Sequence, residues 1–230
     1  MAVALLDDAA MQAFIVRGFH KVSPEEMALP TSFHTAIAEK MRQLFDEEET
    51  RQRTRDSLND ALLHMLPELR DLFADAATNG ALTSILGRDW CLHSHSYAHD
   101  RFPTTAKQEE MIHKDGGFIG TYDGLVTRTR WALILYYPQA VASDFGPTEI
   151  VPHTHYLFEN PLPDPTERGT ALTSVVPGTF VVTSFELWHR ATHNRATTGL
   201  ARFVAMQLAE GISRPAAKPH ATTRFQESTE

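Results

Sequence analysis

Hydrophobic residues in the first part of the chain recur every three or four positions, which is the spacing of one face of an α-helix. This pattern predicts a helix over residues 6–17 that ends at Gly18. The same spacing predicts a second helix over residues 33–45. The chain is therefore expected to begin with helices.

Two further helices are indicated before residue 88, each by a residue type that favours helix ends. Ser57 is suited to be an N-cap and precedes the apolar segment 58–66, which Pro67 interrupts. A short apolar segment over residues 82–86 is followed by Gly87, a residue type common at helix C-termini. Both segments extend the predicted helical part to about residue 88.

Beyond residue 90 the pattern is typical of β-strands. A nearly continuous apolar run at residues 131–137 predicts a strand that is buried on both faces. Runs of β-branched residues predict strands at 173–176 and 179–185, and a final strand is expected at 202–208. The second part of the chain is therefore mainly β.

The length of 230 residues indicates one domain over residues 1–230. We expect a helical part over about 1–88, a β part over about 89–212, and a poorly ordered tail over 213–230. The tail contains two prolines and many polar residues, which do not favour packing into a core.

The charge and the cysteine content narrow the class of partner and the compartment. Acidic residues outnumber basic residues by 29 to 21, a formal net charge of −8, which disfavours nucleic acid or an anionic membrane as the main partner. The single cysteine, Cys91, cannot form an internal disulfide, which fits a reducing cytoplasm. No signal-peptide pattern begins the chain, and no apolar stretch approaches the roughly 18 residues of a membrane span. We expect a cytoplasmic protein.

The candidate metal site is an H-x-D motif, His113 and Asp115, together with the distant His189. Residues two apart on an extended segment share a face, so His113 and Asp115 would project together. Two neutral imidazoles and one carboxylate can cap one face of an Fe(II) octahedron and leave three positions for co-substrate and oxygen. His189 would lie at the end of another strand. His193 is the alternative, but the preceding tryptophan and Asn194 favour His189.

A second group of histidines lies on one predicted strand. Alternation puts His93, His95, Tyr97 and His99 on the same strand face. These side chains could hold a second metal ion or form a polar wall of the active-site cavity. Hydrogen-bonded neutral imidazoles in a polar wall are the commoner arrangement, so cavity lining is the preferred interpretation.

Taken in order, several segments resemble the phytanoyl-CoA dioxygenase family of Fe(II)/2-oxoglutarate oxygenases. The matching segments are the opening at residues 6–8 with Gly18 and Phe19, the H-x-D motif at 113–116, Trp131, residues 146–155, Gly178, the pair Trp188-His189 with Asn194, and Arg202. The order and spacing of these segments carry the resemblance, which extends through most of the chain.

The resemblance implies a double-stranded β-helix, which is a jelly-roll or cupin-like barrel, buttressed by N-terminal α-helices. It implies that His113, Asp115 and His189 hold Fe(II), and that Arg202 binds the distal carboxylate of 2-oxoglutarate through a charge-assisted pair. Trp131 and Asn194 would belong to the co-substrate pocket. The reaction would use O2 to hydroxylate, or otherwise oxidise, a C–H bond while 2-oxoglutarate becomes succinate and CO2.

The sequence departs from the family pattern at three places. His153 replaces a glycine, while the neighbouring His155 resembles a histidine at the edge of the substrate cavity. The loop between Asn194 and Arg202 is about two residues longer than usual, which leaves Arg195 as a competitor for the carboxylate. Ala191 stands where a small hydroxyl residue is common.

Two alternative functions use the same residues. One is a metal-binding barrel without oxygenase activity, such as a hydrolase or isomerase, and the other is a catalytically silent binding module. Related iron halogenases lack the carboxylate ligand, so Asp115 argues against halogenation. The short chain leaves little room for a large lid, so we expect a free small-molecule substrate. The sequence does not indicate an oligomeric state.

Overall fold

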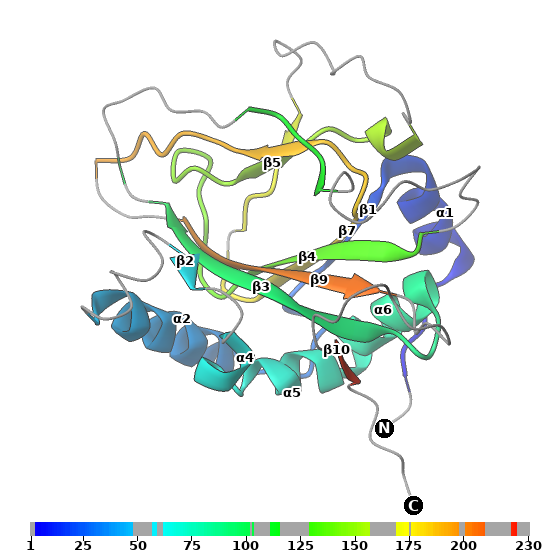
Figure 1. The fold of residues 1–230 in the computed structure, drawn as a ribbon, viewed down its shortest axis with the longest axis horizontal. Coiled ribbons are helices and arrows are strands. Elements are labelled where there is room, and N and C mark those ends of the chain that lie inside the picture. The colour runs from blue at the N-terminus through cyan, green and yellow to red at the C-terminus, as the bar shows by residue number, and fades with distance from the viewer. Residues whose placement is uncertain are drawn as a thin grey trace, which may run out of the picture.

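Two antiparallel sheets and a group of helices make up the structure, a computed structural model (Figure 1). It describes residues 3–47, 57–58, 62–101, 103, 111–115, 129–156, 169–174, 176–197, 201–209 and 222–224. Among these residues the structure is mainly β, with the helices in the first part of the chain, as predicted from the sequence.

Within the described residues the larger sheet has seven strands, and the smaller sheet has three. The order along the larger sheet is β1 (Phe19–Val22), β7 (Thr179–Ser184), β4 (Trp131–Tyr137), β9 (Ala201–Ala209), β3 (Cys91–Arg101) and β10 (Thr222–Arg224), with β2 (Ser57–Leu58) also paired to β3. The smaller sheet is β6 (Thr170–Ala171), β5 (Thr148–Ile150) and β8 (His189–Ala191). All these pairings are antiparallel, so strands from distant parts of the chain become neighbours.

Most of the helices lie against one face of the larger sheet, the smaller sheet lies over the other face, and the first helix lies at the side of the molecule beside β1 (Figure 1). The helices are α1 (Asp8–Arg17), α2 (Thr31–Asp46), α4 (Leu62–Met65), α5 (Leu69–Ala74) and α6 (Ala76–Leu86). No helix in the described part of the chain is long and apolar enough to cross a membrane.

The position of strand β4 between two cores explains why its sequence is almost continuously apolar. Ala132, Ile134 and Tyr136 pack into the core shared with the helices. The alternate residues, Leu133 and Leu135 among them, pack into the core between the sheets. A strand that contributes to two cores cannot alternate apolar with polar residues, so the prediction of a doubly buried strand is confirmed.

The predicted helices at 6–17, 33–45 and 82–86 are confirmed as α1, α2 and the end of α6. Gly18 ends α1 in the left-handed conformation, with φ +84°. Ser57 is not an N-cap, however. It pairs with His99 as part of β2, because an edge position on β3 overrides its local preference.

The strand predictions were right for β4, β7 and β9 and wrong at 173–176. The described residues of that segment form an isolated bridge between Ser174 and Val141, and the neighbouring strand is the short β6 at 170–171. Strand β1 interrupts the predicted helical part, and β10 falls within the expected tail. Both are short and gain their hydrogen bonds from distant partners, so local pattern did not reveal them.

A polar pair lies inside the helix-side core. Nδ1 of His34 is 2.8 Å from the hydroxyl of Tyr136, and both residues are fully buried. Position 178, in the turn before β7, must be glycine, because a Cβ there would lie 2.5 Å from His34 Nε2. Burial lowers the pKa of His34, an effect that the carboxylate of Asp75 partly opposes.

The buried histidine predicts a loss of stability at acid pH. Because the folded state disfavours protonation of His34, the unfolded state binds more protons as the pH falls below about 6.5. The free energy of unfolding should therefore decrease between pH 7.5 and 5.5. His34→Asn keeps a polar partner for Tyr136 but does not titrate, so its stability should depend less on pH.

Urea unfolding at several pH values, with a chelator present, measures this difference. Part of the dependence should remain in the variant, because burial also lowers the pKa values of His20 and His155. Equal pH dependence in the two proteins would contradict a role for His34.

Candidate metal site

A backbone bridge brings two distant histidines side by side. The amide of His113 donates to the carbonyl of His189 at 2.9 Å, and the amide of His189 donates to the carbonyl of His113 at 2.8 Å. In an antiparallel pair of this kind the side chains lie on the same face of the sheet. The two imidazole centroids are accordingly 4.5 Å apart.

Each imidazole is oriented by a carbonyl two residues earlier. Nδ1–H of His113 donates to the carbonyl of Met111, and Nδ1–H of His189 donates to the carbonyl of Leu187, both at 2.9 Å. A proton on Nδ1 leaves the lone pair on Nε2 for a metal. The backbone therefore fixes both the ring orientation and the tautomer that metal binding requires.

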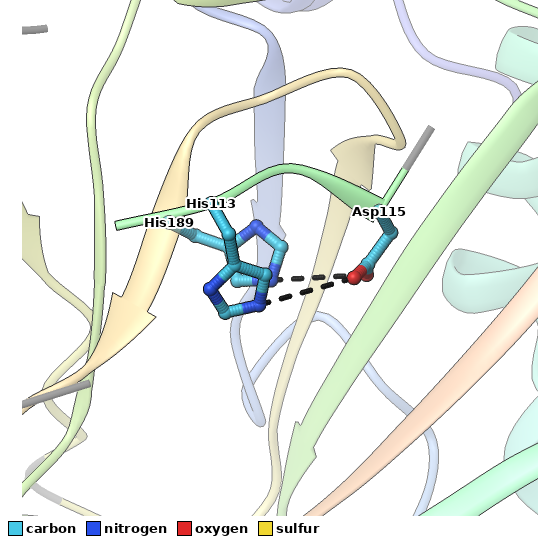
Figure 2. A group of neighbouring side chains, drawn as sticks. All are labelled: His113, Asp115 and His189. Carbon is cyan, nitrogen blue, oxygen red and sulfur yellow. Dashed lines mark ion pairs between the residues drawn. The ribbon is translucent and has the colours of Figure 1, made fainter. Parts of the chain in front are cut away.

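Asp115 completes the group, and its carboxylate faces both rings (Figure 2). Oδ1 is 3.9 Å from His113 Nε2, and Oδ2 is 3.7 Å from His189 Nε2. These three residues form the one group among the described residues that could hold a metal ion. The side chain of His189 is 12% exposed and that of His113 is 45% exposed, so the group is open on the His113 side.

The expected ligand set is therefore brought together, although the local structure differs in two details. His113 lies on an isolated bridge instead of a strand, and His189 begins β8 instead of ending the preceding strand. A turn at 185–186 separates β7 from His189 and carries the chain to the smaller sheet. The rival His193 is not part of the three-residue group.

The residues between the ligands pack behind the site. Lys114 Nζ is 3.4 Å from Glu186 Oε2 and 5.6 Å from the centre of the Trp188 ring. Trp188 is itself buried with Ile112 and Val151. Because Ile112 and Lys114 flank His113 and Trp188 precedes His189, the packing joins the two ligand-bearing segments. No local pattern predicts the pairing of Lys114 with Glu186, because the two residues are distant in the chain.

A buried ion pair supports the other face of the smaller sheet. Arg190 Nη2 lies 3.3 Å from both carboxylate oxygens of Glu149, its partner in the register of β5 and β8. Glu149 Oε1 also accepts the amide of Gly169 at 2.5 Å. Strand alternation directs Arg190 away from His189. This pair holds β8 against β5 beside the metal ligand.

His153 and His155 lie against the C-terminal end of α1. Nδ1–H of His153 donates to the carbonyl of Val16 at 2.8 Å, and Nε2–H of His155 donates to that of Ile15 at 2.9 Å. Helix C-termini leave such carbonyls without helical partners, so these histidines act as a cap. The backbone of His153 is left-handed, with φ +70°, a conformation that glycine adopts more readily. Burial lowers the pKa of His155.

Trp131 and the predicted histidine wall lie on the larger sheet. Trp131 packs edge-on against His93 at 5.6 Å and near Phe185 at 6.2 Å between ring centres. In the register through β9, Tyr97 belongs to the same row as Leu135, which faces the smaller sheet. Tyr97 and His99 pack together at 5.8 Å. The side chain of His95 lies outside the described part of the structure.

Asn194 and Arg202 lie at the ends of the strands around the site. Asn194 is buried, donates from Nδ2 to the carbonyl of Arg101 at 2.7 Å, and accepts the amide of Ala196 at 3.0 Å. It thereby holds the loop after β8 to the end of β3. Arg202 is on β9 opposite Asp100, and its side chain is outside the described part of the structure.

The sequence profile of the phytanoyl-CoA dioxygenase (PhyH) family matches residues 14–202 of the chain. This match covers both histidines, the carboxylate and Arg202. The chain belongs to the phytanoyl-CoA dioxygenase family. The family resemblance seen in the sequence is thus confirmed. No curated protein matches the chain.

Solved structures share the fold of this family member at low sequence identity. EctD from S. alaskensis with 2-oxoglutarate and 5-hydroxyectoine has a TM-score of 0.71 and 17% identity, covering 92% of this chain and 82% of that one. HygX from Streptomyces hygroscopicus with nickel and 2-oxoglutarate has a TM-score of 0.67 and 16% identity, covering 90% and 88%. SnoK, a carbocyclase from nogalamycin biosynthesis, has a TM-score of 0.67 and 14% identity, covering 91% and 88%.

The geometry of this dioxygenase-family site predicts which histidine is essential for metal binding. His189→Ala should weaken binding of Ni(II) or Co(II) by more than the roughly 10–100-fold that loss of an outer hydrogen bond costs. His193→Ala is the matched control, because His193 is outside the group, and it should bind metal normally. Calorimetric titration measures both affinities. A larger loss in His193→Ala would overturn the assignment.

The left-handed backbone of His153 predicts an unusual order of stability. His153→Gly and His153→Ala both lose the hydrogen bond to Val16, but only alanine keeps a Cβ at φ +70°. The glycine variant should therefore be the more stable by about 1 kcal/mol. Chemical denaturation of the two variants tests this difference. Equal stability would show that the backbone relaxes out of this conformation.

Proposed function

We propose that this protein is an Fe(II)/2-oxoglutarate-dependent dioxygenase that hydroxylates a C–H bond of a small molecule. The arrangement of His113, Asp115 and His189 is the observation that carries the proposal. Membership of the dioxygenase family supports the reaction class, and iron-bound and 2-oxoglutarate-bound relatives of the same fold support the cofactors.

The donor set fits Fe(II) in both chemistry and spacing. Ligand atoms about 2.1 Å from one ion lie roughly 3.0–3.5 Å from each other. The distances of 3.9 and 3.7 Å between Nε2 and carboxylate atoms are slightly wider, and the three ligand atoms all lie within 4.8 Å of one another, so the group has to contract around an ion. Two imidazoles and a carboxylate favour Fe(II) with open coordination positions.

The residues of the chain bind, orient and shield, while the cofactor supplies the oxidation. When bound, iron with 2-oxoglutarate and O2 inserts one oxygen atom into a C–H bond, and the other oxygen atom enters succinate as CO2 leaves. His113 and His189 contribute neutral Nε2 atoms, with Nδ1–H held by backbone carbonyls. The ring of Trp131 would form an apolar wall beside 2-oxoglutarate.

Arg202 is the proposed partner of the distal 2-oxoglutarate carboxylate, and Arg195 is the alternative. Both follow the distal histidine, and the family match ends at position 202. Because both arginines are candidates for the same carboxylate contact, the two need separate tests.

The two sheets are proposed to be the halves of a double-stranded β-helix. The larger sheet, its covering helices and the smaller sheet have the layered arrangement that such a barrel requires. Residues 1–230 would form one domain, because strands from both ends of the chain join the larger sheet. The metal site would then lie at the open end, with His93, His95 and His155 as proposed contributors to the substrate cavity.

The substrate is proposed to be a free small molecule. EctD with 5-hydroxyectoine and the carbocyclase SnoK have the same fold, and both names indicate small-molecule chemistry. The name of SnoK also indicates that this fold supports ring closure. The net charge of −8 further disfavours a nucleic-acid substrate.

Anaerobic titration with Fe(II) and 2-oxoglutarate tests the proposal. The wild type should develop a weak, saturable metal-to-ligand charge-transfer band, and His189→Ala should not. Arg202→Ala should weaken 2-oxoglutarate binding by about 10–100-fold, the value of a charge-assisted bond, while Arg195→Ala binds normally.

Each of the other results has a distinct meaning. The reverse order of the two arginine variants would move the carboxylate contact to Arg195. Metal binding without a band would favour a metal protein without oxygenase activity. Absence of metal binding would contradict the proposed function.

A further inference from the structure

We propose that Thr154 is a positioning residue for the metal ligand His189, acting through the backbone amide of Trp188. This inference rests on the proposed metal centre. Thr154 lies in the 3-10 turn η2 (Thr154–Tyr156) and is buried. Its hydroxyl accepts the Trp188 amide at 3.1 Å and donates to the carbonyl of Val151 at 2.6 Å.

The hydrogen bonds of the segment before His189 show why this contact matters. The Leu187 amide donates to Ser184, and the Leu187 carbonyl accepts Nδ1–H of His189. The Trp188 carbonyl accepts the amide of Val151, and both backbone groups of His189 pair with His113. The Trp188 amide is the one N–H donor of this series whose acceptor is a side chain. One hydroxyl thus helps to hold the backbone directly before the ligand.

The local path of the chain explains why a backbone carbonyl does not take this role. Strand β5 pairs with β8 as far as Ile150, opposite His189. The Val151 amide still reaches the Trp188 carbonyl, but the chain then turns at residues 152–153, and the Trp188 amide bonds to Thr154 instead of a strand carbonyl. A buried amide without an acceptor is costly. The Thr154 hydroxyl bonds to both the Trp188 amide and the Val151 carbonyl and so supplies the acceptor that this amide needs.

The turn that carries Thr154 is itself fixed to α1. His153 and His155 on either side of it donate to the carbonyls of Val16 and Ile15, and the His153 amide donates to Arg17 at 3.1 Å. Figure 1 shows this turn beside the end of α1. The contacts form a continuous path from α1 through Thr154 to the metal ligand. Thr154 therefore has little freedom to follow a displaced Trp188.

The first experiment tests the hydrogen bond without metal. The chain has three tryptophans, so labelling with 15N-tryptophan gives three backbone amide signals. In Thr154→Val the Trp188 amide should exchange at least tenfold faster and shift in frequency, while those of Trp90 and Trp131 do not. Thr154→Ser keeps the hydroxyl and should restore slow exchange. Unchanged exchange in the valine variant would overturn the proposal.

The second experiment tests the consequence for the metal. Thr154→Val should bind Co(II) about 10–100-fold more weakly, with an altered d–d absorption spectrum, and Thr154→Ser should resemble the wild type. Thr78→Val is the matched control, because Thr78 is also a buried threonine but lies in α6 on the helical side of the larger sheet. It should lose thermal stability and keep the normal affinity and spectrum.

The outcomes separate this inference from the proposed function. If Thr154→Val binds Co(II) like the wild type, the positioning role is wrong even where the oxygenase assignment holds. If wild-type protein binds Co(II) but forms no 2-oxoglutarate complex, the oxygenase assignment fails while the positioning role is still measured. If all variants, including Thr78→Val, lose affinity equally, general destabilisation explains the effect and the proposal is overturned.

Discussion

The mutual backbone hydrogen bonds of His113 and His189 are the constraint on which the candidate site depends. These two residues are far apart in the sequence, and one antiparallel bridge places their side chains on the same face. The same bridge leaves both Nδ1 atoms within reach of nearby carbonyls, so both Nε2 atoms point toward Asp115. The metal ligands are therefore oriented before any ion binds, which lowers the cost of binding.

The rest of the fold fixes the two segments that form this bridge. His189 begins β8, which is held to β5 by strand pairing and by the buried pair of Arg190 and Glu149. The larger sheet, stiffened by helices on one face, supplies the opposite wall through β4. Helix α1 contributes from outside through the turn at Thr154. Structural elements on both sides of the site thus limit where His189 can move.

The sequence predicted the elements whose signals are local. Strand β4 has an uninterrupted apolar run, and α1 ends at a glycine, so both were found close to their true limits. The H-x-D spacing and the tryptophan before His189 identified the ligands. The family resemblance was carried by the order of such motifs, each of which is short and local.

The features that were missed depend on partners far away in the chain. Ser57 is in a strand because β3 offers an edge, and β1 forms because β7 lies beside it. His153 stood out as a replacement for glycine, but its left-handed backbone and its bond to α1 appear only in three dimensions. The role of Thr154 likewise depends on the turn that follows β5, which only the three-dimensional structure shows. No periodicity in the sequence encodes these contacts.

The most direct test of the metal centre is a crystal structure grown without oxygen in the presence of Fe(II) and 2-oxoglutarate, with anomalous data at the iron edge. The proposed metal centre predicts one anomalous peak about 2.0–2.2 Å from Nε2 of His113, Nε2 of His189 and one carboxylate oxygen of Asp115. A peak at another group of histidines, or a peak contacting fewer than these three residues, would contradict it.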